Sequence, residues 1–92
     1  MPRPQITELR TERSEAELAG HGLAPDHAVE VWLNAPKFYR DKAQGRTMMI
    51  GPDFGGRFLT IIIEPAEAWG AWDVVTGWPS GKGEQTRWKQ AK

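Results

Sequence analysis

Seven side chains in this sequence have the types and positions needed to bind a phosphate and to move a proton. His21 is the best candidate for a general acid or base, because the imidazole titrates close to neutral pH. Arg57 stands beside a predicted turn at the start of a strand, where a guanidinium reaches solvent and binds phosphate in a bidentate manner. The other candidates are three cations, a carboxylate and an aromatic ring: Arg46, Lys82, Arg87, Glu84 and Trp78.

Each candidate also has a purely structural interpretation. Arg57 fits a surface arginine at a strand end, and His21 fits a cap on the last carbonyls of a helix. Lys82 and Arg87 fit a solvated helix face, on which Glu84 pairs with Arg87 three residues later. Trp78 fits core packing or a protein contact as well as stacking on a base. The sequence leaves both sets of interpretations open.

Composition limits the protein to one small domain, residues 1–92. The absence of cysteine excludes disulfides, and two histidines without clustered carboxylates argue against a structural metal, so we expect no metal or cofactor. No apolar run is long enough to span a bilayer and no signal-peptide pattern is present. We therefore expect a cytoplasmic protein without membrane contact.

The net charge is zero, but charge alternates in blocks along the chain. Residues 1–30 hold three arginines against six carboxylates, and residues 58–76 hold three carboxylates without a cation, so each block has a net charge of −3. Residues 34–57 hold five cations against two carboxylates, and residues 77–92 hold four against one, so each has a net charge of +3. Convergence of the two basic blocks on one face would make a phosphate-binding surface; otherwise the surface is simply mixed.

The elements that position these residues centre on a β-hairpin in residues 47–65. Its second strand, Arg57–Glu64, is β-branched and aromatic with apolar residues on both faces, which predicts a central strand. Residues 51–56 contain the glycines, proline and aspartate of a tight turn. A third strand, Ala71–Gly77, follows after a short link, so we expect an antiparallel meander over residues 46–77.

For the segments before and after this meander, the sequence predicts an arm, three helices and a loop. These are a flexible arm at residues 1–5, helices at Ile6–Ala19 and Leu23–Asn34 within residues 6–34, a loop at Lys37–Arg46, and a C-terminal helix or tail at residues 80–92. Ser14 and Glu17 form a capping-box pattern, which is an alternative start for the first helix. The fold class that follows is α+β, with helices on one face of a small three-stranded, or four-stranded, antiparallel sheet.

Several short motifs, by their order and spacing, resemble the BrnT-type toxins. His21-Gly22-Leu23 and the following Pro25 to Pro36 resemble that family's HG(V/L)…EEA…VF…DP segment. Residues 46–51 and 56–59 resemble its R…IG…GR.L hairpin, and residues 77–88 resemble its tail. The resemblance extends over about residues 14–90.

The resemblance implies a RelE-related fold and the toxin of a type II toxin–antitoxin system. Such a toxin is an mRNA endonuclease that inhibits translation and growth, and a cognate antitoxin, commonly a ribbon-helix-helix protein, neutralises it. A metal-independent ribonuclease lets the RNA 2′-hydroxyl attack its own phosphate, which requires a base, an acid and cations. On this interpretation the catalytic residues are Arg57, His21, Lys82 and Glu84, and the RNA-binding residues are Arg46, Arg87 and Trp78.

The alternative is a non-catalytic protein-interaction module, or an inactivated toxin, on the same fold. Trp69, in the link before the third strand, is the best candidate for an exposed aromatic side chain, which suggests a partner groove. Geometry discriminates between the two functions. The nuclease is favoured if Arg46, Arg57, Lys82 and Arg87 form one concave patch that has His21 or Glu84 within hydrogen-bonding reach. The interaction module is favoured if these cations are scattered.

Overall fold

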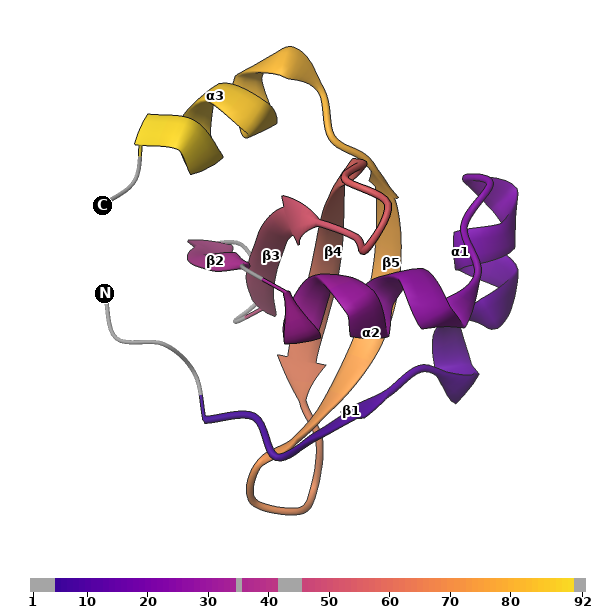
Figure 1. Ribbon diagram of the computed structural model, residues 1–92. Coiled ribbons are helices and arrows are strands. Elements are labelled where there is room, and N and C mark those ends of the chain that lie inside the picture. Colours follow the sequence, from indigo (N-terminus) through magenta and orange to yellow (C-terminus); the bar gives the residue numbers. More distant parts are fainter. Residues whose placement is uncertain (1–4, 35, 42–45, 91–92) are drawn as a thin grey trace.

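The computed structural model describes residues 5–34, 36–41 and 46–90, which form a five-stranded sheet with helices around it (Figure 1). In chain order the elements are β1 (Glu8–Arg10), the 3-10 helix η1 (Glu12–Ser14), α1 (Glu15–Gly20), α2 (Pro25–Leu33), β2 (Lys37–Asp41), β3 (Arg46–Pro52), β4 (Phe58–Pro65), β5 (Ala71–Pro79) and α3 (Lys82–Gln90). The strand order is β1-β5-β4-β3-β2. The arm predicted at residues 1–5 lies outside the described residues except for Gln5, as do the last two residues of the tail.

The hairpin and the meander are confirmed. β3 pairs antiparallel with β4 over residues 47–52 and 58–63, and β4 pairs antiparallel with β5. Residues 59–63 are all buried, so β4 is the central strand and is covered on both faces. β5 extends two residues beyond the predicted end, to Pro79.

The first predicted helix is wrong over its first half. Residues 8–10 form β1, which pairs in parallel with residues 71–73 of β5. The alternative start is confirmed, because α1 begins at Glu15 with Ser14 at its N-cap position. The Ser14 hydroxyl makes no capping hydrogen bond and instead donates to the carbonyl of Thr11 at 3.0 Å. Local propensity favours a helix in this glutamate-rich segment, but pairing with a strand far along the chain overrides it.

The loop predicted at residues 37–46 contains a strand. Residues 37–41 form β2, which pairs antiparallel with β3. The sheet therefore has five strands with mixed pairing, and the predicted three or four antiparallel strands are wrong in number and in pairing at the β1 edge. Successive side chains of a strand point to opposite faces of the sheet, so a strand can be largely polar. In β2, Phe38 packs against the core, while Lys37 and Tyr39 point the other way and contact α3.

Helices cover both faces of the sheet, although the sequence predicted them on one face; the α+β class itself is confirmed. On one face, α1 and α2 pack with the sheet in a core made of Leu18, Leu23, Ala28, Val31, Met49, Leu59, Ile61, Ile63 and Val74. On the other face, the Trp88 ring of α3 meets the Phe58 ring edge-on, with centroids 5.0 Å apart. Phe58 and Leu59 are neighbours on β4, so their side chains point to opposite faces. A central strand that is apolar on both faces needs cover on both.

α2 is joined to the β3–β4 turn. At its start, Nδ1 of His27 accepts the backbone N–H of Ala24 at 2.9 Å. At its end, the amide of Asn34 donates to the carbonyls of Pro52 and Asp53 at 3.2 and 3.1 Å. The turn that precedes β4 is therefore held against the end of the helix.

Candidate functional site

His21 is held at the end of α1 by a Schellman motif. The N–H groups of Gly22 and Leu23 donate to carbonyls of the last helical turn at 3.0 and 2.8 Å. Gly22 has φ +77°, a left-handed conformation that suits glycine. The His21 side chain is exposed, and its ring centroid lies 6.4 Å from that of Trp78.

Trp78 connects His21 to Glu84, and we call these three residues the Trp78 cluster. Trp78 lies near the end of β5, opposite Thr60 of β4. Its indole N–H donates to both carboxylate oxygens of Glu84, at 3.1 and 3.2 Å. Glu84 Oε1 also accepts the backbone N–H of Gly81 at 2.9 Å, as the third helical residue of a capping box does. One carboxylate therefore holds both the indole ring and the first turn of α3.

The start of α3 is fastened to β4. The backbone N–H of Ser80 donates to the carbonyl of Phe58 at 2.9 Å, and the hydroxyls of Ser80 and Thr60 lie 2.8 Å apart. The backbone of Arg57, one residue before Phe58, is thereby brought next to the start of α3. Lys82 is the first residue of that helix and is exposed.

The Arg57 side chain has a carboxylate partner in its own turn. Its Nε lies 3.6 Å from Oδ2 of Asp53; the Asp53 side chain is 7% exposed and that of Arg57 is 47% exposed. Asp53 Oδ1 accepts the N–H groups of Gly55 and Arg57, each at 2.9 Å. Burial acts to raise the pKa of Asp53, but these hydrogen bonds and the Arg57 charge outweigh it and hold that pKa below its ordinary value. Arg57 is thus engaged by Asp53 yet accessible to a ligand.

Arg87 lies over an aromatic ring of β2. Its guanidinium carbon is 4.2 Å from the centroid of Tyr39, within cation–π range, and the Tyr39 hydroxyl donates to the Arg87 carbonyl at 3.2 Å. Nζ of Lys37 donates to the carbonyl of Trp88 at 2.9 Å. Lys37 and Tyr39 were not among the predicted site residues, because their segment was predicted to be a loop. The only local signal for a strand in KFYRD is its adjacent aromatic pair, Phe38 and Tyr39.

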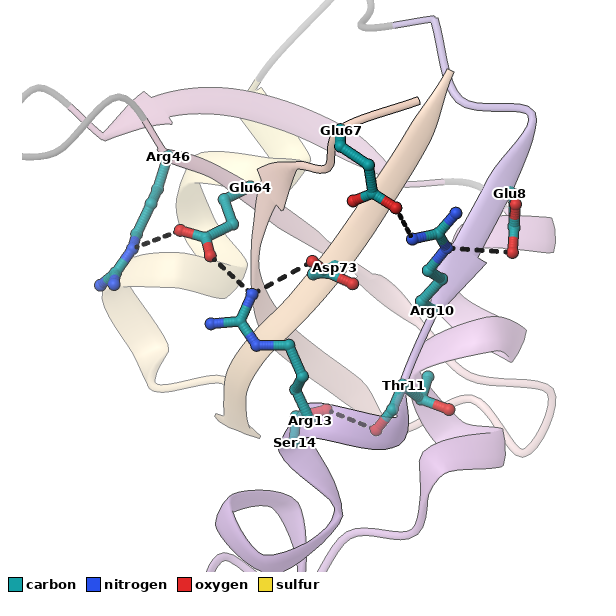
Figure 2. Close-up of polar contacts among 9 residues, drawn as sticks. All are labelled: Glu8, Arg10, Thr11, Arg13, Ser14, Arg46, Glu64, Glu67 and Asp73. Atoms are coloured by element: carbon teal, nitrogen blue, oxygen red, sulfur yellow. Dashed lines mark hydrogen bonds and ion pairs between the residues drawn. The ribbon is translucent and has the colours of Figure 1, made fainter. Parts of the chain in front are cut away.

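Arg46 lies at the opposite end of the hairpin from Arg57, in a network of ion pairs (Figure 2). Its Nε is 3.4 Å from Oε2 of Glu64. Glu64 is directly opposite Asp73, an arrangement in which like charges repel. Nη1 of Arg13 bridges both carboxylates at 3.1 Å, and its hydrogen bonds to Asp73 and then Glu64 raise the pKa of Arg13.

A third arginine makes a separate group of ion pairs on β1. Arg10 Nε lies 3.1 Å from Glu8, and its Nη1 lies 2.7 Å from Glu67 in the β4–β5 loop (Figure 2). The acidic block at residues 58–76 is thus paired with arginines that come from elsewhere in the chain. This role of Arg10 was not predicted, because the residue was expected in a helix.

Five of the seven predicted site residues lie at the end of the sheet where β4 begins and β5 ends. The other two lie elsewhere, Arg87 over Tyr39 of β2 and Arg46 at the start of β3. Contacts join the members of the Trp78 cluster, while Arg57 and Arg87 contact other partners. Arg46 is separated from Arg57 by the length of β3. The four cations therefore do not form a single patch.

Comparison with protein-family models and with curated proteins finds no match to this chain. Among the residues that the structure describes, no three His, Asp or Glu side chains are grouped so as to hold a metal ion. In the same part of the chain, no helix is long and apolar enough to cross a membrane. The function is therefore inferred from the motifs and from the geometry of the Trp78 cluster.

Proposed function

We propose that this protein is the toxin of a type II toxin–antitoxin system, a metal-independent endoribonuclease with a RelE/BrnT-like fold that cleaves mRNA and so inhibits translation and growth. The observation that carries the proposal is the meeting of three distant segments at one end of the sheet. They contribute His21, the backbone of Arg57, and Trp78 with Glu84. Each segment belongs to one of the three BrnT-like motifs.

The chemistry divides among these residues. The 2′-hydroxyl attacks the adjacent phosphorus and the bond to the 5′-oxygen breaks, leaving a 2′,3′-cyclic phosphate and a 5′-hydroxyl. The exposed imidazole of His21 accepts the 2′-proton or supplies one to the leaving oxygen. Arg57 and Lys82 bind the phosphate and stabilise the charge on the phosphorane. Trp78 stacks on a neighbouring base.

Glu84 acts as a positioning residue in this mechanism. Its oxygens already accept the N–H groups of Trp78 and Gly81, so it orients the indole and the start of α3. Arg87 contacts the RNA backbone from a later turn of α3. Arg46 is left out of the site, because it lies at the far end of β3 beside Glu64.

The proposed partner is a cognate antitoxin, of ribbon-helix-helix type by the resemblance. Leu33 and Phe54 are large apolar side chains with exposed fractions of 60% and 66%. They lie on neighbouring segments, because the amide of Asn34 donates to the carbonyl of Asp53 at 3.1 Å. Apolar side chains exposed together suit a protein contact.

A non-catalytic interaction module is the second candidate, and two observations favour it. The four cations are scattered instead of forming one patch, and two of them have carboxylate partners. Arg46 is paired with Glu64, and Arg57 is paired with Asp53. Half of the four cations expected to bind phosphate thus have carboxylate partners in the folded chain. A protein of this kind would bind its partner and leave RNA intact.

The test combines RNA cleavage by the purified chain in EDTA with growth and mRNA integrity after induced expression in a bacterium. Wild type should cut RNA to 2′,3′-cyclic phosphate ends and arrest growth. His21→Ala should lower the cleavage rate about 100-fold or more, the contribution typical of a general acid or base. Arg57→Ala and Lys82→Ala should also lower the rate. Lys89→Ala removes an exposed cation from the other end of α3 and should leave the rate unchanged.

The nuclease proposal is contradicted if the folded wild-type protein cleaves no RNA in vitro or in cells and does not arrest growth. That result would favour the interaction module. Equal losses in Lys82→Ala and Lys89→Ala would assign the effect to the overall charge of α3 and would remove Lys82 from the site.

A further inference from the structure

The β4–β5 loop lies at the end of the sheet opposite α3 (Figure 1). This loop carries an exposed indole. Trp69 is 79% exposed. Backbone hydrogen bonds from Ala66 to Ala71 at 2.8 Å and from Ala71 to Ala68 at 3.0 Å close the loop. A large ring that is exposed on an ordered loop loses little freedom on binding, so it suits an intermolecular contact.

The N-terminal segment supports the same loop. The carbonyl of Gly70 accepts the N–H groups of Thr7 and Glu8 at 2.8 and 3.1 Å. The indole N–H of Trp72, the first tryptophan of β5, donates to the carbonyl of Gln5 at 3.1 Å. A second indole is thereby held close to the loop that carries Trp69.

These elements surround an open hollow of about 480 Å³. Its lining includes Trp69, Trp72, Pro65 and Glu67. The volume is that of a small-ligand pocket, and aromatic faces attract cations through the ring quadrupole.

Charge around the hollow favours a cation over an anion. Glu67 lines the hollow, and the ion pairs that include it join two carboxylates, Glu8 and Glu67, to the one guanidinium of Arg10 (Figure 2). This group therefore has an excess of one negative charge. The Glu67 side chain is 78% exposed, and one of its oxygens lies 2.7 Å from Arg10. The hydrogen bond from Arg10 lowers the pKa of Glu67, which keeps the carboxylate charged at neutral pH.

We propose that this hollow binds an arginine side chain of a protein partner, with the guanidinium stacked on Trp69 and hydrogen-bonded to Glu67. Arginine suits the site better than lysine, because its planar group stacks on an indole and presents several N–H donors to a carboxylate. RNA does not suit it, because the surrounding charge repels phosphate. The hollow lies at the opposite end of the sheet from the Trp78 cluster, so binding here does not depend on RNA cleavage.

The test follows the indole N–H resonances of the 15N-labelled full chain during titration with acetyl-Gly-Arg-Gly-amide into the millimolar range. The citrulline peptide serves as a neutral analogue, at matched ionic strength. The arginine peptide should shift the Trp69 and Trp72 resonances saturably, and the citrulline peptide should bind about tenfold or more weakly. The resonance that disappears in Trp69→Leu is that of Trp69, and this variant should not bind the arginine peptide. Glu67→Gln should weaken binding of the arginine peptide several-fold.

Glu15→Gln is the matched control for Glu67→Gln, because it removes one exposed carboxylate from α1 and should bind the arginine peptide as wild type does. The proposal is overturned if the two peptides bind equally, if the arginine peptide leaves the Trp69 resonance unmoved, or if Trp69→Leu binds as tightly as wild type. A shift of the same resonances by single-stranded RNA would overturn it as well.

Discussion

Replacement of Gly77 by alanine should destabilise the protein, because Gly77 lies where α1 packs on the sheet. An added Cβ would lie 2.6 Å from Cδ1 of Ile61, 3.1 Å from Cδ2 of Leu18 and 3.2 Å from the carbonyl oxygen of Thr60. Leu18 and Ile61 are fully buried, so neither side chain has free space to enter. One of these packed side chains, or α1 itself, must therefore shift to accept the methyl group.

The expected loss follows from two opposing terms. Overpacking of a closed core costs about 1–3 kcal/mol, whereas alanine regains about 0.5–1 kcal/mol over glycine in a strand because it restricts the unfolded chain. With both terms at the middle of their ranges, the free energy of unfolding should fall by about 1 kcal/mol, which lowers Tm by roughly 4–8 °C in a domain of this size. Displacement of Leu18 should also move His21 away from Trp78.

Urea unfolding followed by tryptophan fluorescence measures the change, and Gly83→Ala is the matched control. An added Cβ at Gly83 meets nothing within 4 Å, and alanine is the better helix former, so this variant should gain up to about 1 kcal/mol. The same chemical change should thus have opposite signs at the two positions. A Gly77→Ala protein as stable as wild type, or a loss of equal size at Gly83, would refute the packing argument.

Three further predictions concern the turns and the start of α3. Gly70→Ala should lower the free energy of unfolding, measured in urea, more than Gly56→Ala does. Both glycines have a positive φ, +81° at Gly70 and +88° at Gly56, but only a Cβ at position 70 would collide with Thr7. Equal losses in the two variants would contradict this. Glu84→Ala should cost about 1–3 kcal/mol, because it leaves two N–H donors without their charged acceptor, and should speed amide hydrogen exchange in α3. Unchanged exchange in α3 would exclude that role. Asp53→Asn should weaken the dependence of stability on pH. Folding holds the pKa of Asp53 below its ordinary value, so the charged carboxylate stabilises the folded state fully above about pH 4. This stabilisation is lost as pH falls through the lower pKa of the folded state. The difference in unfolding free energy between wild type and this variant should shrink on acidification, and a constant difference would show that the charge of Asp53 is not the cause.

The central part of the fold was predictable because its signals are local. The isoleucine-rich run of β4 is apolar on both faces, and residues 51–56 contain the turn residues that the hairpin needs. Gly22 at a left-handed position marks the end of α1 in the sequence and in the structure. Pro25 likewise marks the first residue of α2.

The edge strands were not predictable from local pattern. β1 is three residues long and is a strand only because residues 71–73 pair with it in parallel. β2 is mostly polar, and its composition alone does not identify a strand. Its side chains point alternately to the core, as Phe38 does, and to α3, as Tyr39 does, and both of these partners come from elsewhere in the chain. In both cases the partner, more than the intrinsic preference, selects the conformation.

For the candidate site, the sequence by itself determined which residue types were present and which of them end helices or begin strands: His21 after α1, Arg57 before β4, and Lys82 at the start of α3. Only the tertiary structure decided which of them meet. It placed His21 beside Trp78 and Glu84, and it moved Arg46 to the opposite end of the sheet. The physical reason is that strand register and the ion pairs across it join segments far apart in the chain, and no local pattern encodes those distances.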